Sequence, residues 1–280
     1  MTKILFSLPV HENNANVRDT IANAKKYNPG CTIVLHVSAA FSDFDRSVKD
    51  IPSVLMNRVR FHTKHSQASH VPIHFTNYQF ALENSVDFDY VVILHTSEMY
   101  VKFGAVDYIK NYEYSLWFDQ EHQPRSSSWP PFYLSKQNRV FRELFDSNDS
   151  RNYLGNLIEG NFWHRDLFEL MVQWTKQHYS ILDMAWNYPS EECYLPTLAH
   201  HLSKTKDFGH PVNAFHHREH YLKDPVDITD IRENKDIVFW QPNNWVYRKI
   251  PFPSNNIFSI KRVNRDINDP IRQYINSLDQ

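Results

Sequence analysis

The sequence predicts an α/β protein with a mixed, mostly parallel sheet flanked by helices, because short apolar runs rich in β-branched residues alternate with helical patterns. Residues 4–8 and 32–37 are two such runs, and residues 17–27 between them have the periodicity of a helix. The dipeptide Pro29-Gly30 marks the return to the second run. A third run, residues 90–95, is apolar almost throughout, as expected of a parallel strand buried on both faces. This opening is typical of a Rossmann-like half.

The rest of the chain predicts further helices and one late strand. Residues 120–131 are polar and rich in proline but contain aromatic side chains, which indicates a loop or lid and not a linker. We expect a single domain made of two halves, residues 1–118 and residues 119–280. The expected helices are residues 75–82, 165–178, 190–202 and 269–278, and the expected strand is residues 237–240.

Composition excludes several classes of protein. The 280 residues are 41% hydrophobic and carry a formal net charge of −2, so the chain can build a large core but lacks the basic excess that binds nucleic acid or acidic lipid. The two cysteines, Cys31 and Cys193, are too few for a disulfide framework and favour a reducing compartment. The apolar start is too short for a signal peptide, and no run approaches 18 apolar residues. We therefore expect a soluble, cytoplasmic protein without a membrane span.

A pair of carboxylates, Glu191 and Glu192, follows Ser190 at the predicted start of a helix. Acidic side chains there stabilise the helix through its macrodipole, and this ordinary role is one interpretation. The other is that one carboxylate acts as a general base on a hydroxyl group.

A basic cluster, Lys261-Arg262, follows an apolar stretch near the end of the chain, and Arg248 precedes it. Such residues usually form a solvated face. Because their neighbours are apolar, these cations are also expected to emerge from a partly buried segment. In such a setting they can bind a diphosphate through charge-assisted hydrogen bonds and replace a metal ion.

The sequence offers few candidate metal ligands. Asp87-Phe88-Asp89 precedes its strand and so lies at the wrong edge of a parallel sheet, and Asp43-Phe44-Asp45 is expected to be solvated. The end of the third strand offers one carboxylate, Glu98. The histidines of residues 216–220 include a pair four residues apart, but no third ligand is identifiable. We expect no metal site.

Several segments together resemble the glycosyltransferase family of the I-branching β-1,6-N-acetylglucosaminyltransferases and the peptide O-xylosyltransferases. The resemblance spans nearly the whole chain. Its segments are residues 4–11 and 33–38 for the first two strands, residues 94–101 for a strand-end motif, residues 159–165 for a Gly-Ser-x-Trp/Tyr segment, and Glu192 five residues before Thr197. The chain departs from the family at Ser38, where many members have Asp, and at Thr96-Ser97, which replace Gly-Gln.

The resemblance implies a GT-A fold and an inverting, metal-independent transfer from a UDP-sugar to a glycan hydroxyl, with UDP-xylose favoured over UDP-N-acetylglucosamine. It makes residues 1–118 the half that binds the nucleotide sugar and Glu192 the general base. The implied donor-binding residues are Pro9, Val10, His11, His36, Ser38, Ser97, Glu98, Arg248, Lys261 and Arg262. The implied acceptor-binding residues are Glu159, Asn161, Trp163 and Glu191.

Two other functions stay open at this stage. The altered strand-end motif is compatible with a catalytically inert glycan-binding module on the same fold. The sixteen histidines leave open a metallohydrolase.

Overall fold

The computed structural model describes most of the chain. No side chain is described for residues 214, 226, 227 and 237–254. The described residues are 2–11, 13–61, 70–116, 154–178, 191–205, 207–214, 225–235, 237–243, 246–252 and 254–278. The predicted loop at residues 120–131 and the histidines at residues 216–220 lie outside them.

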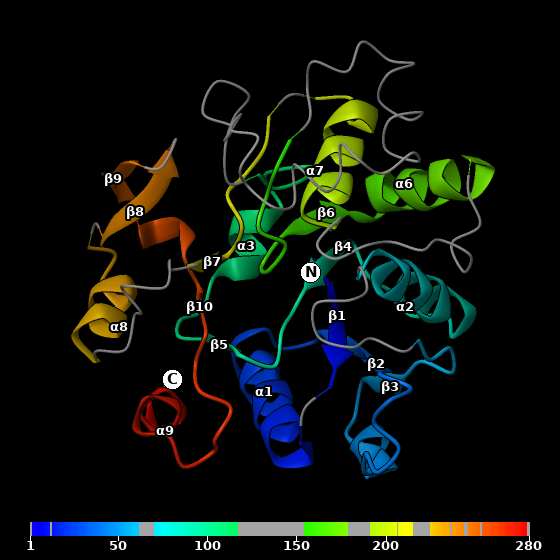
Figure 1. Ribbon diagram of the computed structural model, residues 1–280, viewed down its shortest axis with the longest axis horizontal. Helices are drawn as coiled ribbons and strands as arrows, with labels where there is room; N and C mark the ends of the chain where they lie inside the picture. The colour runs from blue at the N-terminus through cyan, green and yellow to red at the C-terminus, as the bar shows by residue number, and fades with distance from the viewer. Residues whose placement is uncertain are drawn as a thin grey trace.

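The centre of the molecule is a five-stranded sheet with helices on both faces (Figure 1). Its spatial order is β3-β2-β1-β4-β6; the first four strands run parallel, and β6 runs antiparallel to β4. The strands are β1 (Ile4–Val10), β2 (Thr32–Val37), β3 (Val54–Met56), β4 (Tyr90–Ile93) and β6 (Phe162–His164). The predicted class, an α/β protein with a mixed, mostly parallel sheet, is confirmed.

The central strand β1 is buried along its whole length, because helices cover both faces of the sheet. Phe6 and Leu8 pack with helix α1 (Asn14–Tyr27) on one face. Leu5 packs on the other face, in a core shared by α2 (Val71–Glu83), α6 (Arg165–His178) and α7 (Glu191–Leu202). Side chains that alternate between two apolar layers explain why the strand sequences are largely apolar on both faces.

A second, three-stranded sheet joins distant parts of the chain. Strand β10 (Ser259–Lys261) lies between β5 (Glu98–Tyr100), to which it is antiparallel, and β7 (Asn213–Ala214), to which it is parallel. The remaining elements are η1 (Arg46–Asp50), α3 (Ala105–Ile109), α8 (Pro225–Arg232), the antiparallel pair β8 (Ile237–Asn243) and β9 (Val246–Phe252), η2 (Ser254–Asn256) and α9 (Pro270–Ser277).

Both sheets draw strands from both predicted halves of the chain. Strand β6 follows residue 118 yet completes the first sheet, and β5 precedes residue 118 yet belongs to the second. Each sheet therefore depends on pairings between segments that lie far apart in the chain.

Most expected elements are present, and their ends follow local capping. Helix α1 starts at Asn14 because the Asn13 side chain accepts a hydrogen bond from the backbone N–H of Asn16. Helix α9 starts at Pro270, with the Asp269 carboxylate accepting hydrogen bonds from two backbone N–H groups of its first turn. Helix α6 has the predicted bounds, and α2 is longer than expected at both ends.

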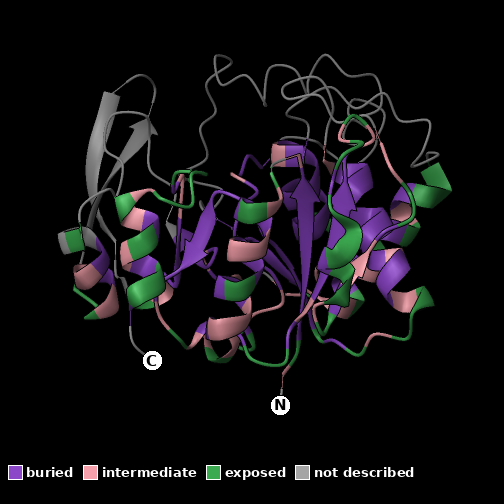
Figure 2. Ribbon diagram, turned by 90° about the horizontal axis from the view of Figure 1, so that it is seen from below, coloured by how far each residue is buried: buried purple, intermediate pink, exposed green. Residues whose placement is uncertain are grey.

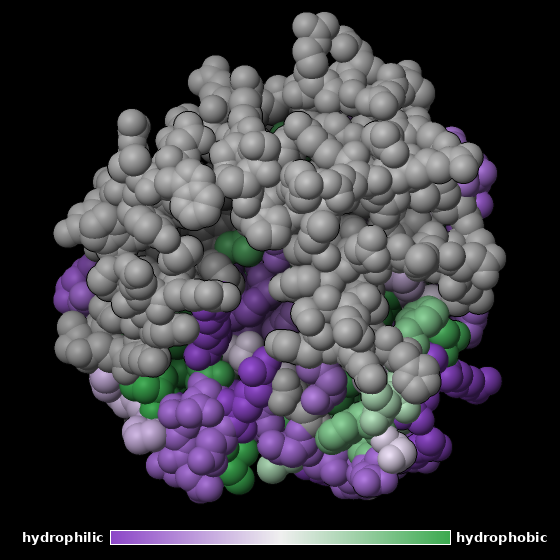
Figure 3. Space-filling view, viewed as in Figure 1, coloured by the Kyte–Doolittle hydropathy of each residue, from purple (hydrophilic) through white to green (hydrophobic). Residues whose placement is uncertain are grey.

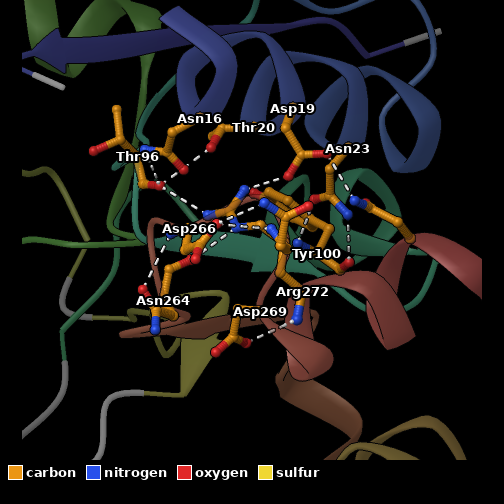
Figure 4. A network of polar contacts seen from close by, with 12 residues as sticks. Asn16, Asp19, Thr20, Asn23, Thr96, Tyr100, Asn264, Asp266, Asp269 and Arg272 are labelled. Atoms are coloured by element: carbon orange, nitrogen blue, oxygen red, sulfur yellow. Dashed lines mark hydrogen bonds and ion pairs between the residues drawn. The ribbon is translucent and has the colours of Figure 1, made fainter. Parts of the chain in front are cut away.

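The C-terminal helix α9 is anchored by one buried cation, Arg272 (Figure 4). Its guanidinium contacts the carboxylate of Asp19 in α1 and donates to the backbone carbonyls of Asn264, at 2.8 Å, and Thr96, at 3.2 Å. Two side chains of α1 donate to the same Thr96 carbonyl, Asn16 at 3.1 Å and Thr20 at 3.2 Å. Helices α1 and α9, from the two ends of the chain, therefore both bind the turn that follows β4.

Two further observations concern the expectations from composition. Within the described ranges, no helix combines the length and apolar character needed to cross a membrane. Cys31 and Cys193 are both buried, and they form no disulfide with each other.

Candidate functional site

The carboxyl ends of β1 and β4 lie side by side at the point where the strand order reverses, since β1 pairs in parallel with both β2 and β4. In open α/β sheets, ligands bind outside the carboxyl ends of the strands at such a switch point. Figure 2 shows the buried central strands pointing toward one side of the molecule, opposite the N-terminus. The space-filling view shows hydrophilic side chains at its centre, in a recess (Figure 3).

Three residues from distant parts of the chain meet beside this edge: Glu98, Glu159 and Lys261. Lys261 of β10 stands opposite Glu98 of β5 in the antiparallel register. The Lys261 ammonium also contacts the Glu159 carboxylate, and the two side chains are only 13% and 8% exposed. The structure therefore brings together three residues that the sequence assigned to one site.

This cluster contains several polar atoms with unused hydrogen-bonding capacity. Within the described part of the chain, one carboxylate oxygen of Glu98, one of Glu159 and Nε2 of His95 are buried without a hydrogen-bond partner. His95 Nε2 lies 4.0 Å from the other Glu159 oxygen. Because buried polar groups are nearly always satisfied, such a concentration of exceptions indicates a place that binds polar ligand groups.

Burial shifts the proton affinities of the cluster. It raises the pKa of Glu98 to about 7, against the opposing effects of the Ser259 hydroxyl and Lys261. It lowers the pKa of Lys261 to about 7, with Glu98 opposing this and Arg262 and Arg265 adding to it. The charges of this site therefore respond to small changes in its surroundings.

Local structure fixes the two carboxylates. Glu98 is completely buried and accepts a 2.6 Å hydrogen bond from the Ser259 hydroxyl. Glu159 precedes Gly160, which has a φ of +67° and whose N–H donates to the carbonyl of Ile93 at the end of β4. A Cβ at Gly160 would lie 2.6 Å from the Asn213 Cβ, so only glycine allows β7 to approach this turn.

Glu192 lies in the first turn of α7, where proline within the helix creates a connection to the site. Pro196 has no N–H to donate to the Glu192 carbonyl, and the backbone N–H of Asn156 donates there instead, at 2.7 Å. Thr197 adds hydrogen bonds to the backbone N–H and carbonyl of Leu154. Helix α7 therefore holds residues 154–161, the segment that carries Glu159.

The two carboxylates of α7 interact with each other. Burial raises the pKa of Glu192 well above its ordinary value, and the charge of Glu191 raises it further. Glu191 is buried and Glu192 half-buried. Glu192 and Lys261 are connected through residues 154–161, because the Asn156 N–H donates to the Glu192 carbonyl and the Glu159 carboxylate contacts Lys261. Their convergence on one anomeric carbon stays a prediction.

The expected donor-binding residues of the first two strands line the same edge. Pro9 and Val10 are buried in β1, and the Ser38 N–H donates to the Val10 carbonyl at 2.9 Å. His36 is buried, and its Nε2 accepts a hydrogen bond from the Phe61 backbone at 3.0 Å. Burial lowers the pKa of His36 to about 4, so this imidazole is neutral.

Of the remaining expected donor-binding residues, the structure describes Ser97 and Arg262 but not the side chain of Arg248. Ser97 is buried, and its carbonyl accepts a hydrogen bond from Val263 at 3.0 Å. Arg262 directly follows β10 with a φ of 65°, which turns the chain away from the strand. Arg248 pairs with Gln241 in the β8–β9 hairpin, but its side chain lies outside the described set.

Four histidines meet at this edge, of which only His11 was expected from the sequence to bind the donor. The rings of His11, His74 and His95 surround that of His70, with centroids 6.1, 6.2 and 5.9 Å from it, respectively. His74 is completely buried against the Ser7 hydroxyl, at 2.8 Å. The signal available in the sequence was the pair His70 and His74, spaced like neighbours on one helix face.

Two expected acceptor-binding residues have structural roles here. Trp163 has no exposed area and packs on Phe168 in the core, so it offers no ring face to a sugar. The Asn161 side-chain oxygen accepts hydrogen bonds from Ser115 and Asn156, and its nitrogen contacts the Leu157 carbonyl. Both side chains therefore face the interior, Trp163 in the core shared with α6 and Asn161 among the polar groups that it binds.

The acidic motifs are placed as expected. Asp87 and Asp89 bind Lys3 at 2.5 and 2.7 Å, at the amino end of the sheet. Asp45 caps η1 and pairs with Arg18 at 3.0 Å. Among the described residues, no group of three or more His, Cys, Asp or Glu side chains has an arrangement that would hold a metal ion.

No protein-family model matches this chain, and no curated protein matches it in sequence. Among solved structures, glucosyl-3-phosphoglycerate synthase from Mycobacterium tuberculosis, in complex with Mn²⁺, uridine diphosphate and phosphoglyceric acid, is 11% identical over 90% of this chain and 87% of that chain, with a TM-score of 0.33. The apo-form glycosyltransferase GlyE of Streptococcus pneumoniae TIGR4 is 12% identical over 69% of this chain and 44% of that chain, with a TM-score of 0.26. TM-scores this low assign neither a family nor an activity to this chain.

Proposed function

We propose that the chain is an inverting, metal-independent glycosyltransferase of GT-A type, which moves a sugar from a UDP-sugar to a hydroxyl group of a glycan. The observation that carries this proposal is the meeting of Glu98, Glu159 and Lys261 beside the switch point of the sheet. A buried ammonium at such an edge is suited to bind the diphosphate of a nucleotide sugar.

In this proposal Glu192 removes the proton of the acceptor hydroxyl as that hydroxyl attacks the anomeric carbon. Burial and the charge of Glu191 raise the pKa of Glu192, which makes its carboxylate a stronger base than an ordinary glutamate. Lys261 and Arg262 stabilise the departing UDP, and a single in-line displacement inverts the anomeric configuration. Glu159 and Glu191 are the proposed contacts of the acceptor.

The proposal that no metal ion is needed depends on the donor set at the end of β4. Glu98 is the carboxylate at this position, and its neighbours are the hydroxyl of Ser259 and the ammonium of Lys261. A cation in this place relieves the same developing charge that a divalent metal ion would. Xylose is the favoured donor sugar and N-acetylglucosamine the other, both from the family resemblance.

The test is transfer from UDP-xylose and UDP-N-acetylglucosamine to a panel of glycan acceptors, with and without EDTA. Glu192→Gln is expected to lower kcat by about 10²–10⁴-fold, the contribution of a general base. Lys261→Ala is expected to lower kcat by about 10²–10³-fold, as for the loss of one electrostatic donor. Full activity in either variant, or loss of wild-type turnover in EDTA, would contradict the mechanism.

A further inference from the structure

Lys261 already has an anionic partner in the protein, the carboxylate of Glu159. The side chains of both residues are at least 87% buried, so the ammonium needs a counter-ion and the carboxylate needs a cation. In the proposed function the same ammonium binds a diphosphate. Two anions then compete for one buried cation.

The local charges make this competition unavoidable. Glu98 faces Lys261 across the strand pair and is held by the Ser259 hydroxyl, 2.6 Å away. A diphosphate placed at Lys261 would therefore meet two carboxylates at short range in a poorly hydrated setting, where repulsion between like charges is strong. Since Glu98 is fixed by its strand, Glu159 is the carboxylate that has to leave.

A second partner for Glu159 is close by. Nε2 of His95 lies 4.0 Å from the Glu159 oxygen that contacts Lys261, and this nitrogen is buried without a hydrogen-bond partner among the described residues. An imidazole with its proton on Nε2 donates to a carboxylate after a shift of about 1 Å, which brings the pair into hydrogen-bond range. His95 itself directly follows β4 and Leu94, at the edge of the sheet.

We propose that Glu159 is an exchangeable counter-ion: it neutralises Lys261 in the empty site, gives up Lys261 to the diphosphate of the donor, and then accepts a hydrogen bond from His95. This inference rests on the proposed function, because it requires that Lys261 binds a diphosphate. It adds that the Glu159 carboxylate weakens donor binding in the empty site. Removing the charge of Glu159 by substitution should therefore raise the affinity for the donor.

The test is calorimetric titration with UDP and with uridine, at one fixed pH. Glu159→Gln keeps the shape of the side chain and removes its charge, so UDP is expected to bind about tenfold more tightly, within the usual range of couplings between sites. Uridine, which has no diphosphate, is expected to bind the variant and the wild type equally. The matched control is Glu83→Gln, an exposed carboxylate at the end of α2, which should change neither affinity.

A double-mutant cycle tests the second partner. His95→Phe is expected to weaken UDP binding severalfold in the wild type and to have no effect in the Glu159→Gln background, because the exchange then has no carboxylate to accommodate. Thermal unfolding checks that each variant is folded. If Glu159→Gln does not fold, Glu159→Asp, which shortens the reach to Lys261, is expected to give a smaller gain in UDP affinity.

The outcomes separate this inference from the proposed function. If the wild type binds no nucleoside diphosphate, the proposed function itself is wrong. If the wild type binds UDP but Glu159→Gln and Glu159→Asp bind it equally or more weakly, the proposed function stands and the counter-ion exchange is wrong. Additive effects of His95→Phe and Glu159→Gln would also overturn the exchange.

Discussion

Two buried cations near the C-terminus, Arg272 and Lys261, show how differently one chain can use a buried charge. Arg272 has no exposed area, and its Nε and both terminal nitrogens contact Asp19 or backbone carbonyls (Figure 4). Lys261 is also buried, but its neighbours Glu98 and Glu159 each retain an oxygen without a hydrogen-bond partner among the described residues.

The difference indicates a difference in role. Each of the three guanidinium nitrogens of Arg272 already contacts a protein oxygen, so we expect Arg272 to serve the structure. Unsatisfied polar atoms beside a buried cation leave capacity for a ligand, so we expect Lys261 to belong to a binding site. The comparison predicts that substitutions at the first residue change stability and that substitutions at the second change binding.

Arg272→Met should produce the largest loss of stability. The variant leaves the Asp19 carboxylate without its cation and the Thr96 carbonyl with one donor fewer, and breaking a buried ion pair costs about 3–5 kcal/mol. Urea unfolding followed by circular dichroism measures the change. Arg232→Met, on the neighbouring helix α8, is the control at a half-buried cation. An Arg272→Met variant within about 1 kcal/mol of the wild type would remove the distinction between the two cations.

Glu98→Gln should give a smaller, pH-dependent effect on stability. The folded-state pKa of Glu98 is about 7, above the ordinary value of 4.5, so the unfolded chain loses this proton first as the pH rises. The wild type therefore loses stability between pH 4.5 and about 7, and the loss is complete above that window. Glu98→Gln has no such proton.

The measurement is the unfolding free energy of both proteins across this range. The difference in favour of Glu98→Gln is expected to grow from acidic to neutral pH by up to about 3 kcal/mol, since each pKa unit is worth about 1.4 kcal/mol. If the difference between the two unfolding free energies stays constant with pH, burial does not raise the pKa of Glu98.

Pro196→Ala should have the smallest effect. Alanine restores an N–H that can bind the Glu192 carbonyl, which then competes with the Asn156 N–H for that acceptor. Loss of one such hydrogen bond is worth about 0.5–1.5 kcal/mol, so transfer should fall by roughly 2–10-fold as the segment bearing Glu159 loosens. Amide hydrogen exchange at Asn156 should become faster. Unchanged exchange would show that α7 does not hold this segment.

Much of the fold was predictable because its signals are local. Strand β2 and helix α6 have the bounds expected from the apolar pattern, and Asp269-Pro270 marks the start of α9. The contact of Arg272 with Asp19 was not predictable, because nothing near Arg272 distinguishes it from an exposed arginine of an amphipathic helix. Its burial is decided by a partner 253 residues away.

The candidate site was predictable in its members but not in their contacts. Glu98 and Lys261 were singled out from their neighbours in the sequence, and Glu159 from the family resemblance. The position of Lys261 opposite Glu98 follows from the register of β5 with β10, and Glu159 is placed by the turn at Gly160, which no local pattern specifies. The resemblance assigned Trp163 to the acceptor, but the packing of β6 places its ring in the core. The role of Pro196 was not predicted, because the carbonyl that it leaves unbonded is bonded by Asn156, which lies in another segment.

The most direct test of the central claim is the affinity for UDP of Lys261→Met, measured by calorimetry beside Lys49→Met, an exposed lysine of η1. Lys261→Met is expected to bind UDP at least about tenfold more weakly than the wild type, because it loses a hydrogen bond to a charged group, whereas Lys49→Met is expected to bind UDP like the wild type. Equal affinities in Lys261→Met and the wild type would contradict the account, because the buried ammonium beside the sheet edge would then have no part in binding the diphosphate.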